Sequence, residues 1–151
     1  MRTRRSIHVA LGATVLLTLA MATSGFALAG GRPFTVAPLT GAAEAPNPGD
    51  LDGTGLARFW MNPGTGVVCY DYTVSGVAPL AAAHIHVAPA GVAGPVVIPT
   101  PPTRADGGTG CVSAARDLLV AILTHPSAYY FNVHNADFPA GALRGQLSRR
   151  P

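Results

Sequence analysis

The stretch Ala83-His84-Ile85-His86-Val87 separates two histidines by a single apolar residue. In a β-strand successive side chains point to opposite faces, so His84 and His86 would share one face. Their Cα atoms would then lie roughly 6.6 Å apart, at ~3.3 Å per residue, which lets both imidazoles reach one ion or one anionic group. A second stretch, Phe131-Asn132-Val133-His134, repeats the alternation near the C-terminus. The sequence therefore predicts two histidine-bearing strands.

Short apolar segments separated by turn-rich segments extend over most of the remaining chain. Strands are predicted over 33–36, 55–61, 67–74, 80–87, 95–98, 111–113, 129–134 and 142–147. The glycines and prolines of 40–52 and 99–110 indicate loops. One helix is predicted around 118–123, capped by Ser113 or Asp117 and ended by Pro126. We expect an all-β fold, an antiparallel Greek-key-like β-sandwich or barrel with one short helix.

The N-terminus has the three parts of a secretory signal peptide. Three arginines precede an apolar run over 9–22, and the small residues of Ala27-Leu28-Ala29 form a cleavage site. We expect residues 1–29 to be the signal peptide and residues 30–151 to be a single secreted or extracytoplasmic domain (cell envelope or periplasm). Arg4-Arg5 leaves twin-arginine export open beside the general secretory route.

Charge argues against a nucleic-acid partner, and the distribution of apolar residues argues against a membrane anchor. The chain has ten basic residues, all arginine, and seven acidic ones. Three of the ten arginines lie in the expected signal peptide, so the remaining seven balance the seven acids. No basic stripe remains for nucleic acid, and no apolar segment remains to hold the cleaved protein in a membrane.

The two cysteines, Cys69 and Cys111, both fall in the expected mature domain. In an exported protein an even pair is most simply a disulfide, whereas a Cys/His metal site would need more thiols. Closing this loop contributes roughly 4 kcal/mol in the chain-entropy model.

The histidines are the candidate site. His84 and His86, with His134 as a third ligand, would suit copper or zinc, since neutral imidazole is a usual ligand of both. The alternative is that they are half-buried polar residues hydrogen-bonded to the backbone or a carboxylate. No nucleophile–base pair indicates an enzyme, and the acidic residues, Glu44 among them, lie mostly in expected loops where solvation explains them.

Two further segments have a plain packing interpretation. Tyr129-Tyr130-Phe131 is expected in the core rather than on a ligand-binding face. Leu118 to Leu123 is expected to pack on the domain's own sheet rather than on a partner. Arg144 is expected to pair with a carboxylate of the chain rather than to bind an anionic ligand.

Several motifs together resemble the chordin (CHRD) domain family. Ala83-His84-Ile85-His86 with Gly94-Pro95-Val96-Val97 resembles the first half of the pattern. Tyr130-Phe131-Asn132-Val133-His134 and Leu143-Arg144-Gly145-Gln146-Leu147 resemble the second half, which gives Asn132, Arg144, Gly145 and Gln146 as motif residues. Ala142 stands where the family usually has Glu, which removes an expected partner of Arg144.

The resemblance implies an extracellular β domain that acts as a non-enzymatic binding module for an unknown extracellular protein or ligand. The His-x-His strand is also similar to the copper-ligand strand of copper-zinc superoxide dismutase, although 99–110 contains no histidine to form its zinc loop. The alternative function is therefore copper or zinc binding, or metal-dependent redox chemistry, at His84, His86 and His134.

Overall fold

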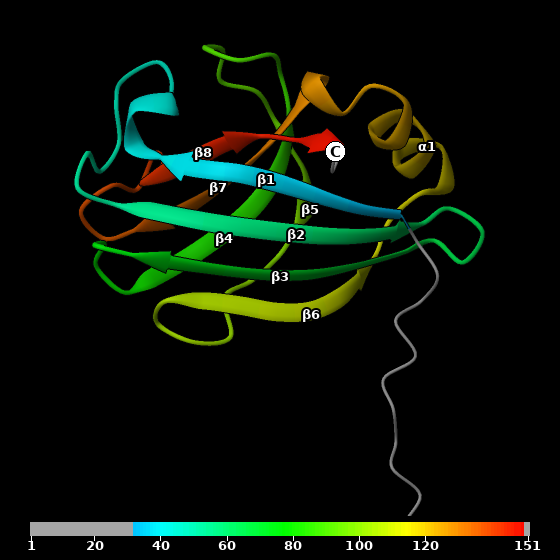
Figure 1. Cartoon of the computed structure of the whole chain (residues 1–151), viewed down its shortest axis with the longest axis horizontal. Coiled ribbons are helices and arrows are strands. Elements are labelled where there is room, and N and C mark those ends of the chain that lie inside the picture. The colour runs from blue at the N-terminus through cyan, green and yellow to red at the C-terminus, as the bar shows by residue number, and fades with distance from the viewer. Residues whose placement is uncertain (1–31, 150–151) are drawn as a thin grey trace, which may run out of the picture.

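The computed structural model describes residues 32–149, which form one curved antiparallel sheet and a short α-helix (Figure 1). The expected signal peptide lies outside the described residues. The elements are β1 Arg32–Thr40, β2 Thr54–Asn62, β3 Val67–Ser75, β4 Leu80–Val87, β5 Val96–Pro99, β6 Gly107–Ser113, α1 Arg116–Thr124, β7 Tyr129–Asn135, β8 Leu143–Gln146 and β9 Ser148–Arg149. Two 3-10 turns, Gly41–Ala43 and Pro126–Ala128, follow β1 and precede β7.

The sheet has the strand order β5-β4-β7-β8-β1-β2-β3-β6, and β9 pairs with β1. It rolls over on itself, so that β1, β2, β3 and β6 lie in front of β4, β5 and β7 (Figure 1). Phe131 of β7 joins the two layers, since its ring centroid lies 5.3 Å from that of Phe59 in β2 and 5.0 Å from that of Tyr72 in β3. The predicted all-β sandwich or barrel with one short helix is confirmed.

The predicted strands 55–61 and 67–74 correspond to β2 and β3, which form a hairpin paired without a break from Thr54↔Ser75 to Asn62↔Val67. Alternate residues of β3 share one face of the strand and are all buried in the core: Val68, Tyr70, Tyr72 and Val74. The side-chain oxygen of Asn62 accepts hydrogen bonds from the Gly64 and Thr65 amides and so holds the turn. Strand alternation was sufficient to predict this part of the fold.

The predicted disulfide joins Cys69 of β3 to Cys111 of β6. The two residues are direct cross-strand partners with Cα atoms 3.9 Å apart. The bond therefore ties an edge strand of the sheet to its only described neighbour strand.

Two local predictions were wrong. The helix begins at Arg116 with Ala115 as its N-cap and has no side-chain cap hydrogen bond, because Ser113 ends β6 and Asp117 lies inside the first turn. Strand β6 begins at Gly107, inside the segment expected to be loop. The apolar side of α1 does pack inward as expected, with Leu119 and Ile122 fully buried.

Candidate functional site

The outer face of β4, β7 and β8 carries a buried polar cluster. On β4, Ala83 and Ile85 point into the core, so His84 and His86 point the other way. The same alternation puts alternate residues of β7 and β8 on this outer face: Tyr130, Asn132, His134, Arg144 and Gln146. The structure thus brings together all three candidate metal ligands and three of the four motif residues. Gly145, the fourth motif residue, has no side chain; its position on β8 faces the core side, where it pairs with Phe131.

The loop 88–95 covers this face and explains its burial. His86 donates from Nδ1 to the Gly94 carbonyl at 2.8 Å, and the Gly94 amide contacts the Tyr130 hydroxyl at 3.2 Å. Gln146 donates to the Ala88 carbonyl at 2.7 Å. Backbone carbonyls of one loop therefore hold several side chains of the cluster in fixed orientations.

Two of the histidines have their tautomer set by backbone carbonyls. A carbonyl can only accept, so the hydrogen bonds from His86 to Gly94 and from His134 Nδ1 to Pro139 (3.1 Å) place a proton on each Nδ1. In the neutral rings, Nε2 then carries the free lone pair. His86 Nε2 is buried and has no hydrogen-bond partner.

The three rings meet closely enough to share an ion. One ring nitrogen from each of His84, His86 and His134 lies within 4.8 Å of the others. His84 Nδ1 and His134 Nε2 are already 3.2 Å apart, close to the ~3.3 Å between two ligands of a tetrahedral site with metal–nitrogen bonds of about 2.0–2.1 Å.

Burial favours the neutral form of His84 and His134. Desolvation, with a smaller repulsion from His134 and His86, lowers the pKa of His84 to about 4. Desolvation also lowers the pKa of His134, against an opposing hydrogen bond to the Pro139 carbonyl. Neutral imidazole is the form that coordinates a metal.

These lowered pKa values predict that the domain loses stability as the pH falls from about 6.5 toward 4. In the unfolded chain His84 has an ordinary pKa of 6.5. Over this pH interval the unfolded state therefore binds a proton that the folded state does not, and this stabilises the unfolded state. We expect a loss of about 1–2 kcal/mol from His84, less than the full conversion of the shift because the ring is half-exposed. Denaturant unfolding across this pH range, compared between wild type and His84→Gln, measures the difference. Parallel pH profiles for the two proteins would contradict the prediction.

Asn132 links the histidines to a buried carboxyl group. Its Oδ1 lies 3.0 Å from His134 Nε2, and its side chain also hydrogen-bonds Glu44. Since His134 Nδ1 already donates to Pro139, an ionised Glu44 in this chain requires a doubly protonated His134. A protonated Glu44 with the amide reversed leaves His134 neutral. Burial raises the pKa of Glu44 and lowers the pKa of His134, so it disfavours the charged form of both groups.

Arg144 is well anchored, although Ala142 in place of the family's usual Glu predicted the loss of a partner. It is 1% exposed and donates to the Val92 and Pro89 carbonyls, each at 2.9 Å. Its guanidinium carbon lies 3.4 Å from the centroid of the Tyr130 ring. No carboxylate among the described residues forms an ion pair with it, although the charge of Glu44 acts on it. Carbonyl oxygens replace the expected carboxylate, and they carry no side-chain signal in a sequence.

Two further residues of the cluster were misjudged. Glu44 is not a solvated loop residue, because it is 8% exposed and one of its oxygens has no hydrogen-bond partner. Tyr130 is buried as expected, yet it lies outside the hydrophobic core, stacked on His86 at 4.7 Å between ring centroids. Strand alternation gave the signal for Tyr130, since core residues Tyr129 and Phe131 flank it.

The fold and this outer-face cluster define a disulfide-linked all-β domain with a buried polar site between its sheet and a covering loop. The chain belongs to the CHRD domain family, whose model matches residues 35–147. Comparison with curated proteins and with solved structures gives no match. In the part of the chain that the structure describes, no helix is long and apolar enough to cross a membrane.

Proposed function

We propose that this CHRD domain is an extracytoplasmic, non-enzymatic binding module, and that it binds a copper or zinc ion through His84, His86 and His134. The observation that carries the proposal is the convergence of three ring nitrogens within 4.8 Å of one another. Two of the rings are oriented by backbone carbonyls, as metal-ligating histidines commonly are.

The donor set narrows the choice of ion. Three imidazoles without a carboxylate suit borderline metals such as copper(II) and zinc better than calcium or magnesium, which prefer oxygen ligands. Three protein ligands leave one position open in a four-coordinate site, whereas closed structural zinc sites take four. The open position suits an exchangeable ion or a metal-bound ligand.

Three observations support an extracytoplasmic location of this protein. The CHRD domain is an extracellular-type domain, and a disulfide is typical of proteins outside the reducing cytoplasm. The tripartite N-terminus of the sequence points the same way. Binding of an extracellular protein, which the likeness to chordin implies, stays a prediction without a designated surface.

Calorimetric titration of copper(II) and zinc into the purified protein tests the proposal. We expect one ion per chain, and each of His84→Ala, His86→Ala and His134→Ala to weaken binding about 100-fold, or ~2.7 kcal/mol. His125→Ala is the matched control, because His125 is exposed and lies outside the cluster. Its affinity should equal that of wild type.

Two results would overturn metal binding. One is a wild-type protein that takes up neither ion at neutral pH. The other is a set of cluster variants that bind as tightly as wild type, which would assign the uptake to other groups. In either case the histidines serve only to fasten the covering loop.

A further inference from the structure

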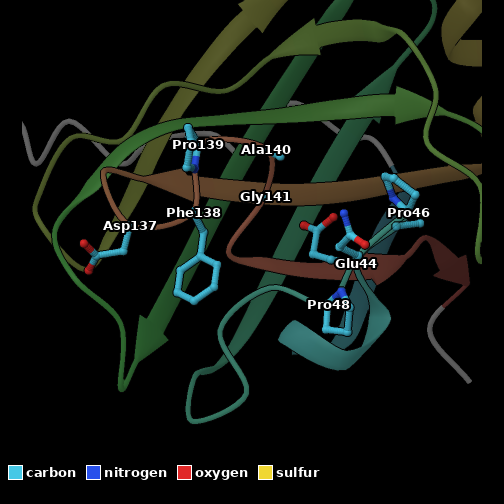
Figure 2. A pocket seen from close by; sticks show the side chains of 10 residues that line it. Glu44, Pro46, Pro48, Asp137, Phe138, Pro139, Ala140 and Gly141 are labelled. Atoms are coloured by element: carbon cyan, nitrogen blue, oxygen red, sulfur yellow. The ribbon is translucent and has the colours of Figure 1, made fainter.

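A second candidate site lies beside the histidine cluster, in a cavity of about 220 Å³ between two loops (Figure 2). One wall is the segment 44–48 that follows β1 and its 3-10 turn, and the other is the segment 137–141 between β7 and β8. Ordinary small-molecule pockets measure roughly 300–1,000 Å³, so this cavity is sized for a single side chain or a very small ligand.

Glu44 supplies a buried acidic group to this cavity. The residue is 8% exposed, and its Oε1 atom is enclosed yet accepts no hydrogen bond. Its known compensation is one hydrogen bond from Asn132, one from the Ala45 backbone and the charge of Arg144, and burial outweighs these in raising the pKa of Glu44. A buried carboxylate with an unused oxygen requires a further donor to be stable in its ionised form.

Gly141 makes room for this carboxyl group. Its φ is +150°, and a Cβ placed on it would overlap the Glu44 carboxyl oxygens. Figure 2 shows the Glu44 side chain next to this glycine, between the two loops. Glycine at position 141 is therefore required to accommodate an acidic side chain that has too few hydrogen-bond partners.

Apart from Glu44, the lining is apolar except for Asn47 and one further acid at the rim. Side chains of three prolines and Phe138 form much of the wall, and Asp137 is exposed at the edge. No arginine or histidine lines the cavity, so Glu44 and Asp137 are its only ionisable lining groups. Apolar walls around a carboxyl group suit a ligand that has methylene groups and a cationic end.

We propose that this cavity binds an alkylammonium group, with the ammonium at Glu44 and the methylenes against Pro46, Pro48 and Phe138. An ammonium is compact and has three donors, so it can supply the Glu44 carboxyl group with hydrogen bonds that it lacks. Calcium would need six to eight oxygen ligands, more than two carboxylates readily supply. The same chemistry is offered by a small free amine and by a lysine side chain of a partner protein. The cavity shares no lining residue with the metal site proposed above.

Binding is tested by amide chemical-shift titration and calorimetry with n-butylammonium and with Nα-acetyl-lysine-N-methylamide, in the presence of a chelator and at mildly alkaline pH. 1-Butanol is the uncharged control ligand. We expect the two cations, and not butanol, to shift amides within 44–48 and 137–141. Response to both cations assigns the site to a lysine side chain, and response to butylammonium alone assigns it to a small amine.

Two variants and one control identify the site. Glu44→Gln keeps the shape and removes the charge, and it should weaken binding at least about 10-fold. Ala140→Phe fills the rim without altering Glu44 and should weaken binding by about the same factor. Ala136→Phe changes an exposed residue of the same loop outside the lining and should bind as wild type does. Unchanged melting temperatures would show that the variants fold.

The proposal is overturned if neither cation shifts these amides, or if folded Glu44→Gln binds as tightly as wild type. The buried carboxyl group is then a structural partner of Asn132 and Arg144 only. Because a chelator is present throughout, this outcome leaves the metal proposal unaffected, and loss of metal binding leaves this one unaffected.

Discussion

Replacing Arg144 by methionine is expected to lower the free energy of unfolding by about 3–5 kcal/mol, the usual cost of removing one member of a buried charged network. Methionine keeps most of the length of the side chain but cannot donate. The Val92 and Pro89 carbonyls, each 2.9 Å from the guanidinium, lose a charged donor while they stay covered. Tyr130 also loses the cation that lies 3.4 Å from its ring centroid. Urea denaturation measures the change.

Arg58→Met is the matched control for that variant. Arg58 is exposed on β2, and its replacement should change stability by no more than about 0.5 kcal/mol. Adding Glu44→Gln to Arg144→Met should recover part of the loss, since Glu44 no longer keeps a buried negative charge without its neighbouring cation. An Arg144→Met protein within about 1 kcal/mol of wild type would show that water replaces the guanidinium at the carbonyls.

Strand alternation made the histidine face predictable. A period of two places His84 and His86 opposite Ile85, and the same period places Asn132 and His134 opposite Val133. What the period cannot predict is which face becomes the core and how the other face is covered. The sequence offers no signal that backbone carbonyls of 88–95 would fasten the outer face, since every residue has a carbonyl group.

Glycine content explains the missed start of β6. Glycine is uncommon inside strands, so a run containing Gly107, Gly108 and Gly110 indicates a loop. In the structure these residues pair with β3, and a Cβ on Gly108 or Gly110 would contact the hydroxyl of Tyr72 or Tyr70 at 2.7 or 3.0 Å. The glycines let two tyrosines extend beneath the edge strand to the Thr100 and Pro101 carbonyls. This is a tertiary requirement that no local pattern expresses.

Glu44 was misjudged for a related reason. A single acidic residue among Ala, Pro and Asn has the composition of a solvated loop. Its burial depends on Gly141, almost a hundred residues further along the chain, where the missing Cβ leaves space for the carboxyl group. Local composition therefore predicted the loop correctly and the environment of its one charged side chain wrongly.

Removing the disulfide with the double variant Cys69→Ser, Cys111→Ser is expected to lower the free energy of unfolding by about 4 kcal/mol, because the bond closes a separation of 42 residues in the unfolded chain. Cys111 is exposed and Cys69 is only half-buried, so serine leaves no large cavity and adds little to this loss. Strand β6 is a sheet edge rich in glycine and pairs only with β3 among the described strands. Its amides should therefore show the largest rise in hydrogen-exchange rate.

Chemical reduction separates the cross-link from the substitutions. Reduced wild type and the double variant should unfold at the same urea concentration, well below that of oxidised wild type. Thr109→Ser, an exposed change on the same strand, is the control and should alter stability by no more than about 0.5 kcal/mol. If reduction left the unfolding midpoint in place, pairing of β6 with β3 would be sufficient without the cross-link, and the chain-entropy account of this bond would be wrong.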